Sequence, residues 1–297
     1  MTDRLLGSGL IIVDKPAGMT SHDVISRLRR IFGTRRIGHA GTLDPMATGV
    51  LVVGIERGTR FLAHLVTETK TYRATIRLGA STTTDDAEGD ITSRTDTTGV
   101  TDTIIDAAIT QLTGDIMQKP AAVSAIKIDG KRAHERVRDG ETVDIPARPV
   151  TVHRFDVLDR RSVDGYIDLD VDVFCSSGTY IRSLARDLGN ALGVGGHLTA
   201  LRRTTVGPFD LTHARTLEEL EDNPQLSLTL DQALAASFPV LRVSGEEGHK
   251  LAMGQWLEPR GLKEIHAAVT PDGRTVALVK EKGKRLATVF VARPSTL

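Results

Sequence analysis

The chain has 297 residues, enough for one large domain and a smaller one. It is 40% hydrophobic and 26% charged, as ordinary globular proteins are, which excludes a disordered or fibrous class. Lys plus Arg and Asp plus Glu both number 38, so the formal net charge is zero; this excludes a uniformly basic nucleic-acid binder but allows local basic faces.

The cysteine content and the length of the apolar stretches indicate the cellular compartment of the protein. The single cysteine, Cys175, allows no intrachain disulfide and gives no sign of a structural zinc site. Residues 1–6 lack the apolar core of a signal peptide, and apolar stretches such as 49–55 are too short to span a bilayer. We therefore expect a soluble, cytoplasmic protein.

The first predicted elements are a buried strand over residues 10–13 and an amphipathic helix over 22–32. Thr20 and Ser21 supply an N-cap for this helix, and Gly33 ends it. Its polar side and the residues beyond it carry five arginines, which are read equally well as a solvated face or as a phosphate-contacting edge: Arg27, Arg29, Arg30, Arg35 and Arg36.

The next segments alternate between loops and short elements. Residues 38–49 are loop-like, and 50–55 are a second buried strand. Moderate alternation predicts a strand over 72–78, and the composition of 81–99, rich in Thr, Asp and Gly, predicts a surface excursion. Apolar residues at helical spacing predict a helix over 101–112.

Residues 166–175 alternate cleanly, which predicts a strand with one apolar and one solvated face. Asp168, Asp170 and Asp172 share the solvated face; we interpret them as water-facing rather than metal-binding, because no His or fourth carboxylate is positioned nearby. A helix follows over 179–192, with apolar residues on one side.

The end of the chain changes character. Short helical patterns over 215–237 end at Phe238-Pro239, and the remainder contains strand-like runs separated by turns. We therefore expect a catalytic domain over 1–238 and a small β-rich domain over 239–297. Strands mixed with helices without regular βαβ alternation favour an α+β fold.

The most unusual segment is the glycine-rich string from Gly38 to Gly49, Gly-His-Ala-Gly-Thr-Leu-Asp-Pro-Met-Ala-Thr-Gly. Its glycines allow close approach of a ligand to the backbone, and Pro45 restricts Asp44 to an extended conformation. Taken alone, an Asp-Pro pair in such a loop is most often just a turn.

This string resembles the catalytic loop of the TruB family of tRNA pseudouridine synthases. Four other segments match the family's motifs in the family's order, and together they cover about residues 9–210: Val13-Asp14-Lys15-Pro16-Ala17-Gly18-Met19-Thr20-Ser21, Lys70-Thr71-Tyr72-Arg73-Ala74, Ser177-Gly178-Thr179-Tyr180-Ile181-Arg182, and His197-Leu198-Thr199-Ala200-Leu201-Arg202-Arg203. The resemblance implies a pseudouridine synthase fold with a mixed, largely antiparallel central sheet flanked by helices. A weaker resemblance of the C-terminal module is to the PUA (pseudouridine synthase and archaeosine transglycosylase) RNA-binding domain.

The resemblance also implies the reaction, which is isomerisation of uridine 55 in the tRNA T loop without a cofactor or metal. Asp44 would be the nucleophile, attacking C1′ or adding at C6 of the base. Arg182 would lie beside it, because a guanidinium within about 4–6 Å keeps an aspartate ionised and orients it. Tyr72 would stack on the uracil and offer a phenol for proton transfer.

Further residues are assigned to binding by the same resemblance. A uridine in a folded loop must leave its stack, and His39 is the candidate for filling the vacated space. Tyr180 and Leu201 would be walls of the base pocket. Lys15 is interpreted mainly as a support of the catalytic loop, with direct RNA contact as the alternative.

The expected partner is the T-stem loop of tRNA, bound by a monomer without an obligate protein partner. Since the total charge is zero, RNA must meet local patches. Besides the five arginines of the first helix, the candidates are Lys127, Lys131, Arg132, Arg136 and Arg138, and near the C-terminus Lys280, Lys282, Lys284 and Arg285.

Two other functions compete with this one. A non-catalytic RNA-binding or RNA-folding protein would need none of Asp44, Tyr72 and Arg182 together, although assistance to tRNA folding can coexist with catalysis. A glycoside hydrolase would need a second carboxylate, and no other acid stands in the Asp44 loop.

Overall fold

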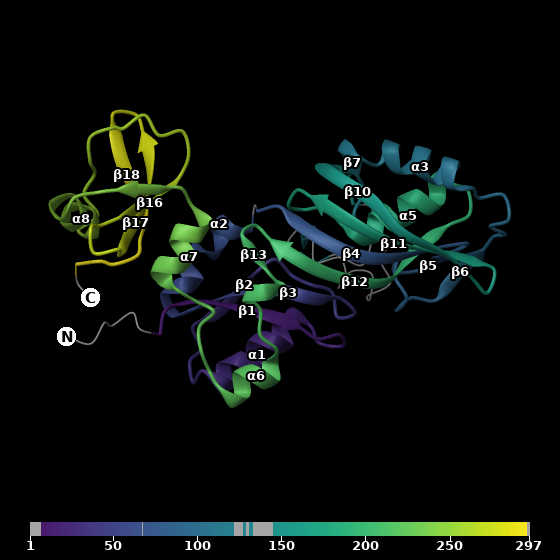
Figure 1. The fold of residues 1–297 in the computed structure, drawn as a ribbon, viewed down its shortest axis with the longest axis horizontal. Coiled ribbons are helices and arrows are strands. Elements are labelled where there is room, and N and C mark those ends of the chain that lie inside the picture. Colours follow the sequence, from purple (N-terminus) through teal and green to yellow (C-terminus); the bar gives the residue numbers. More distant parts are fainter. Residues whose placement is uncertain (1–6, 67, 122–126, 129–130, 133–144, 296–297) are drawn as a thin grey trace. The chain divides into compact units, whose positions relative to one another are not determined.

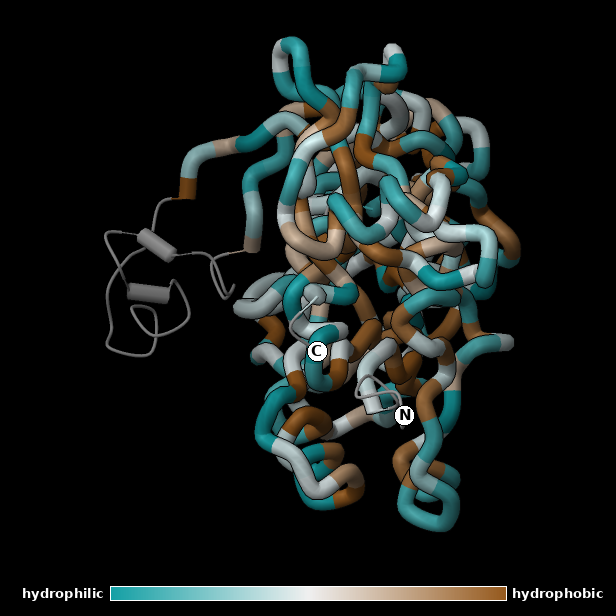
Figure 2. Tube along the Cα trace, turned by 90° about the vertical axis from the view of Figure 1, so that its left-hand side faces the viewer, coloured by the Kyte–Doolittle hydropathy of each residue, from teal (hydrophilic) through white to brown (hydrophobic). Residues whose placement is uncertain are grey.

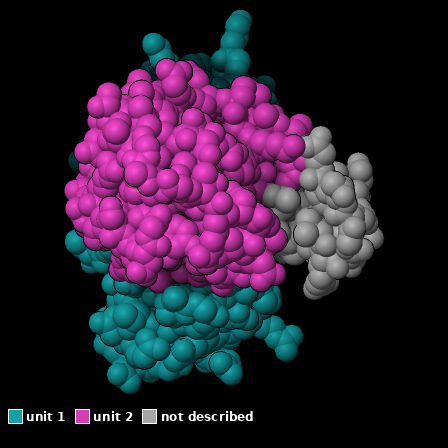
Figure 3. Space-filling model, turned by 90° about the vertical axis from the view of Figure 1, so that its right-hand side faces the viewer, with its two compact units in different colours: residues 1–45, 49–67, 205–297 teal, residues 46–48, 68–204 magenta. Residues whose placement is uncertain are grey.

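The computed structural model describes residues 7–66, 68–121, 127–128, 131–132 and 145–295 (Figure 1). The chain divides into two compact units (Figure 3). Unit 1 comprises Met1–Pro45, Gly49–Thr67 and Thr205–Leu297, and unit 2 comprises Met46–Thr48 and Glu68–Thr204. The expected division at residue 238 stays a prediction.

Unit 1 contains the two ends of the chain. Its strands are β1 (Gly9–Lys15), β2 (Ile37–Ala40), β3 (Thr48–Ile55, whose first residue is in unit 2), β13 (Phe209–Asp210), β14 (Leu228–Thr229), β15 (Val240–Arg242), β16 (His266–Val269), β17 (Thr275–Lys282) and β18 (Arg285–Val291). Its helices are α1 (Ser21–Ile31), η1 (Glu56–Phe61), α2 (Leu62–Leu65), η2 (Leu211–His213), α6 (Leu217–Asp222), α7 (Leu230–Ser237) and α8 (Gly245–Ala252).

Strand β1 lies between β3 and β14, and β2 pairs with β3; all of these pairs are antiparallel. Both faces of β1 and β3 are covered, which explains their continuous apolar sequence. One face, with Ile11 and Val53, packs against α1 and α6. The other, with Leu10 and Val52, packs against α2, α7 and part of the C-terminal sheet.

The C-terminal sheet has the order β15-β16-β17-β18, with β15 parallel to β16 and the other pairs antiparallel. Helix α8 packs on β17 and β18. Its own apolar cluster includes Leu251, Val279 and Leu286. On the opposite side Ala267 and Leu278 join the core that contains Leu10, so the sheet shares a core with the first strand of the chain.

Unit 2 contains strands of the ten-stranded sheet in the order β12-β4-β11-β10-β7, of which the β4–β11, β11–β10 and β10–β7 pairs are antiparallel. Its elements are β4 (Lys70–Leu78), β5 (Ala80–Thr82), β6 (Ile91–Arg94), α3 (Asp102–Gln111), β7 (Gly114–Gln118), β8 (Lys127–Ile128), β9 (Lys131–Arg132), β10 (Arg148–Val163), β11 (Tyr166–Cys175), α5 (Ile181–Ala191) and β12 (Gly196–Val206, whose last two residues are in unit 1). Figure 2 shows hydrophilic residues at many of the outermost loops of the trace and hydrophobic residues mainly in its interior.

Most predicted elements are confirmed within one to three residues, and the α+β class is confirmed. The helix predicted over 22–32 is α1, whose N-cap Thr20 forms a capping box with Asp23. The strand predicted over 166–175 is β11. No helix in the described part of the chain is long and apolar enough to cross a membrane.

Two predictions were wrong in part. Residues 37–40 form strand β2 rather than a loop, because they pair along the edge of β3 where periodicity leaves no signal. The excursion 81–99 contains the β5–β6 hairpin and the buried Asp86. The C-terminal module is β-rich, as predicted, and contains helix α8 in addition to its four strands.

Candidate active site

Asp44 lies in the loop that connects β2 to β3, between the buried side chains of Leu43 and Ala47. Its own side chain is half-buried. The loop begins at Gly41, whose φ is 81°, and Gly49, the second residue of β3, has a φ of 99°; both values lie in the region that favours glycine. The backbone can therefore turn sharply on either side of the aspartate.

The residue before Asp44 is fixed by a serine of α1. The Ser21 hydroxyl accepts the N–H of Leu43 at 2.9 Å and donates to the carbonyl of the same residue at 3.1 Å. Ser21 is only 2% exposed. Both backbone groups of Leu43 are thus satisfied by one buried side chain, which fixes the chain just ahead of the carboxylate.

The residue after Asp44 is fixed by the Lys-Pro motif. The carbonyl of Pro45 accepts the N–H of Gly18 at 2.8 Å and the ammonium of Lys15 at 3.2 Å. Lys15 is fully buried, and its ammonium also donates to the carbonyls of Pro16 at 2.8 Å and Met19 at 2.6 Å. One buried cation thereby ties the turn after β1 to the loop of Asp44.

His39 lies five residues before Asp44, on β2, where it is opposite Val53 of β3. Its side chain is half-buried. His39 and Asp44 thus come from one strand-loop segment of unit 1.

Tyr72 and Tyr180 are held by unit 2. Tyr72 is a buried residue of β4, opposite Val173 of β11. Tyr180 is the N-cap of α5, and the buried side chain of Gln118 accepts its N–H at 2.8 Å and donates to its carbonyl at 3.1 Å. A single amide side chain therefore fixes the backbone where α5 begins.

Arg182 is in the first turn of α5 and is only 5% exposed. Its Nη1 donates to the carbonyl of Thr84 at 3.1 Å and lies 3.5 Å from Oδ2 of Asp86, which is 2% exposed. A buried guanidinium needs such a counter-charge. Oδ1 of Asp86 accepts the Thr84 hydroxyl at 2.5 Å and the N–H of Glu88 at 3.0 Å.

Asp86 was missed by the reading of the sequence. It stands in the run Thr-Thr-Thr-Asp-Asp-Ala, whose composition is that of a turn, and nothing local distinguishes it from Asp85. Asp85 pairs with Arg186 instead, at 3.1 Å, and burial raises its pKa against the opposing effect of Arg186. The two neighbouring carboxylates therefore pair with different arginines of α5.

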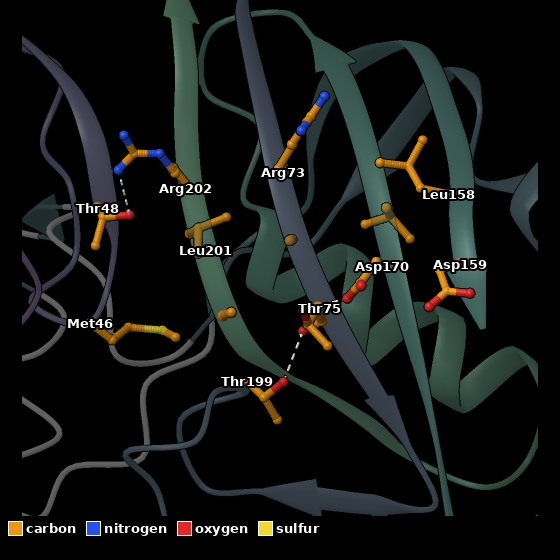
Figure 4. A pocket seen from close by; sticks show the side chains of 13 residues that line it. Met46, Thr48, Arg73, Thr75, Leu158, Asp159, Asp170, Thr199, Leu201 and Arg202 are labelled. Atoms are coloured by element: carbon orange, nitrogen blue, oxygen red, sulfur yellow. Dashed lines mark hydrogen bonds between the residues drawn. The ribbon is translucent and has the colours of Figure 1, made fainter. Parts of the chain in front are cut away.

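Leu201 lines a hollow of about 520 Å³ within unit 2 (Figure 4). Other residues that line it are Met46, Thr48, Arg73, Thr75, Asp170, Thr199 and Arg202. Arg202 reaches Oγ1 of Thr48 at 3.2 Å, and the Thr199 hydroxyl donates to the carbonyl of Thr75 (Figure 4). Tyr72 is not among the residues that line this hollow, so Leu201 and Tyr72 are not brought together there.

The three aspartates of β11 each meet an arginine. Arg77 holds Asp168 through two bonds of 2.8 Å, Arg161 holds Asp170, and Arg154 holds Asp172 at 2.6 Å. Asp168 is buried beneath its arginine rather than water-facing, which corrects that part of the prediction. Among the described residues, no group of three or more His, Cys, Asp or Glu side chains gathers as a metal site would need.

The basic residues that are predicted to bind RNA differ in their exposure and in their ion pairs. Arg27 is engaged by Glu221, at 2.7 Å, and by Glu218 of α6, so it belongs to an ion-pair cluster of unit 1. Arg30 and Arg35 are exposed. Arg136 and Arg138 lie outside the described residues. The C-terminal basic residues are all exposed: Lys280, Lys282, Lys284 and Arg285.

The candidate residues thus form two groups. Asp44, His39 and Lys15 belong to unit 1, whereas Tyr72, Tyr180, Arg182 and Leu201 belong to unit 2. The expected pairing of Asp44 with Arg182 stays a prediction.

Three family descriptions match the chain in succession. Residues 29–181 match the N-terminal domain of TruB family pseudouridylate synthases. Residues 182–236 match the C-terminal domain of tRNA pseudouridylate synthase B, and residues 238–293 match the C-terminal part of tRNA pseudouridine synthase II.

Curated relatives are similar over their whole length. The tRNA pseudouridine synthase B of Corynebacterium efficiens is 73% identical over 297 residues, which are 100% of both chains. That of Rhodococcus jostii is 57% identical over 294 residues, 99% of this chain and 96% of the relative.

Solved structures show the same fold. The chain in a Cbf5-Nop10-Gar1 complex has a TM-score of 0.74 and 28% identity, covering 98% of this chain and 86% of that one. The archaeal box H/ACA sRNP Nop10-Cbf5 complex gives a TM-score of 0.71 at 27% identity, covering 98% of this chain and 88% of that one.

Proposed function

Because the chain belongs to the TruB family of tRNA pseudouridine synthases, we propose that Asp44 is the nucleophile with which it converts uridine 55 of the tRNA T loop into pseudouridine. The enzyme is an isomerase. The bond from N1 of the base to C1′ of the ribose breaks, the base turns, and a bond from C5 to C1′ forms. A proton leaves C5 and N1 gains one, so no electrons are exchanged with a cofactor.

The reaction needs one well-aimed carboxylate. As the glycosidic bond breaks, C1′ becomes electron-poor, and an aspartate can stabilise it or bond to it, as carboxylates do in glycosidases. The observation that carries the assignment is the double anchoring of the Asp44 loop, by Ser21 at Leu43 and by Lys15 and Gly18 at Pro45. Such anchoring holds a reacting group near its productive geometry.

Arg182 and Tyr72 are the other proposed catalytic residues. A guanidinium at Asp44 would keep that carboxylate ionised and orient it. Arg182 suits this role because Thr84 and Asp86 fix it in its buried position. Tyr72 would stack on the extruded uracil and carry the proton that leaves C5. The attack of Asp44 on C1′ and its addition at C6 remain alternatives.

The binding assignments follow the same reasoning. His39 would enter the space that the flipped uridine vacates. Tyr180 and Leu201 would bound the base pocket. Lys15 supports the loop, since its ammonium is fully buried and donates to three carbonyls. We also propose that the enzyme acts as a cytoplasmic monomer on the T-stem loop, with residues 239–297 as an RNA-binding module.

The test is turnover of unmodified tRNA by Asp44→Asn. The substitution keeps the size of the side chain and removes its charge, so pseudouridine formation should fall by about 10⁴-fold or more while tRNA affinity changes less than about two-fold. Pseudouridine is mapped in the product tRNA. Asp96→Asn, at an exposed aspartate that caps a turn with Thr98, is the matched control and should be fully active.

Two results would contradict the proposal. Measurable turnover by Asp44→Asn would remove the nucleophile assignment. Absence of pseudouridine with the unsubstituted protein, together with tight tRNA binding, would leave an RNA-binding protein. Assistance to tRNA folding stays a separate prediction, which the inactive Asp44→Asn variant can test because it retains binding.

A further inference from the structure

The C-terminal segment is charged differently from the rest of the chain. Residues 238–293 contain ten basic and six acidic side chains, a net charge of +4, although the whole chain has 38 of each sign. The basic residues are Arg242, Lys250, Arg260, Lys263, Arg274, Lys280, Lys282, Lys284, Arg285 and Arg293. Such an asymmetry indicates an anionic partner for this segment.

Most of the acidic side chains of residues 238–293 form hydrogen bonds or ion pairs with other residues of the same segment. Glu281 accepts backbone N–H groups from Arg260, Gly261 and Leu262, at 2.5, 2.8 and 3.2 Å. Glu247 caps α8 and pairs with Arg260. The β17–β18 hairpin bears four of the ten cations, and its one acid is Glu281, so it presents little negative charge to solvent.

Three cations share one face of the β17–β18 hairpin. Lys282 is directly opposite Arg285, and Lys280 is opposite Ala287. Since directly opposed residues and residues two apart point to the same face, Lys280, Lys282 and Arg285 project together. All three are exposed, and no ion pair with an acid is found for them among the described residues.

Trp256 lies at the edge of this face. It is the only tryptophan of the chain and is 45% exposed. The guanidinium carbon of Arg285 lies 4.7 Å from the ring centroid. The next residue, Leu257, exchanges two backbone hydrogen bonds with Leu286, at 3.0 and 2.8 Å, which fixes the indole beside the hairpin.

A hollow of about 530 Å³ adjoins the indole. Trp256 lines it together with Lys250, Arg260 and Gln255, and with Glu247 and Glu258 as the acidic members. The ring therefore has Arg285 beside it and a hollow large enough for a planar group.

We propose that the face formed by Trp256, Arg285, Lys280 and Lys282 binds an RNA strand, with an unpaired base stacked on Trp256 and the phosphates on the lysines. Stacking on an aromatic ring combined with a cationic track is how proteins hold single-stranded RNA, and an arginine on the ring adds a cation–π contribution. A base paired in a helix offers no free face for stacking. This assignment rests on the proposed function, because it supplies the RNA substrate with a second contact.

The unsubstituted protein tests this directly, since all tryptophan fluorescence comes from Trp256. Titration with a single-stranded oligoribonucleotide should quench this emission saturably, whereas a duplex of equal length should not. An unquenched signal with the single strand, or equal quenching by the duplex, overturns the proposal.

Variants separate stacking from charge. Trp256→Leu should weaken binding of the single strand roughly ten-fold without changing the salt dependence of the affinity. Lys280→Gln combined with Lys282→Gln should lower the slope of log affinity against log salt by about 2. Lys263→Gln, at an exposed lysine outside the hairpin face, is the matched control and should leave both unchanged. Loss of affinity in the control alone, or no loss in the other two, contradicts the assignment.

The outcome is distinguishable from failure of the proposed function. If tRNA is converted to pseudouridine but no RNA quenches Trp256, only the C-terminal site is refuted. If RNA quenches Trp256 but no pseudouridine forms, the C-terminal site stands and the catalytic assignment fails.

Discussion

The loop of Asp44 in unit 1 and the side chain of Arg182 in unit 2 are held by different kinds of contact. Around Asp44, a serine hydroxyl, a backbone N–H and a lysine ammonium bind the backbone of Leu43 and Pro45. Around Arg182, a carboxylate and a carbonyl bind the side chain itself. Arg182 is buried, and a buried guanidinium needs a counter-charge such as the one Asp86 supplies.

This contrast predicts that side-chain deletions in unit 2 act more strongly than deletions of the anchors in unit 1. Arg182→Ala should lower the rate of pseudouridine formation about 10³-fold with less than a three-fold change in tRNA affinity, because it removes the orienting charge itself. Single-turnover rates and filter binding measure the two quantities. Equal losses in both would indicate a phosphate contact.

Asp86→Asn should have the next largest effect. It removes the counter-charge of Arg182 but keeps an oxygen for the Thr84 hydroxyl, so the rate should fall by about 10–100-fold. Asp85→Asn is the matched control, since Asp85 pairs with Arg186. If the control loses as much activity as Asp86→Asn, the contact with Arg182 is not what matters.

Ser21→Ala tests the anchor in unit 1. It leaves two buried backbone groups of Leu43 without a partner, which should cost about 1–3 kcal/mol of stability and lower the single-turnover rate about ten-fold at unchanged tRNA affinity. Ser227→Ala removes a similar bond, from the N–H of Ile12 in β1, and should lower stability without lowering the rate. An equal loss of rate in both variants would mean that Ser21 acts only through stability.

The smallest effect concerns the pH dependence of stability. Burial, with a contribution from Arg203, lowers the pKa of Lys70 to about 8. Between about pH 8 and pH 10.5 the unfolded state therefore binds more protons than the folded state, so the free energy of unfolding should rise with pH. Lys70→Met should lack this rise, and urea unfolding at pH 7.5 and 10 measures the difference. Parallel curves for the two proteins would contradict the lowered pKa.

Local sequence patterns predicted the helices and strands whose structure depends on residues within the same segment. The capping box of Thr20 and Asp23 and the alternation of β11 are examples, since each depends on neighbours within the segment. Strand β2 could not be predicted this way. It has only four residues, and they acquire their structure from pairing with β3. Helix α8 was likewise hidden among glycines and charges.

The residues of the candidate site likewise fall into those that the sequence indicated and those that it did not. Resemblance of motifs nominated Asp44, Tyr72 and Arg182, and their roles stay predictions. Asp86 and Ser21 carry no comparable signal, since their importance lies in contacts with residues 96 positions and 22 positions away in the chain. Such partners are found only when the fold brings the segments together.

The core shared by the first strand and the C-terminal sheet bears on how the protein is made. Leu10 and Ile12 leave the ribosome first, yet part of their cover, Ala267, Leu278 and Ala292, is translated last. The strand that ends at Lys15 therefore waits for almost the whole chain before its core is complete. A nascent chain halted near residue 238 would lack Ala267, Leu278 and Ala292, so this face of β1 would be incompletely enclosed.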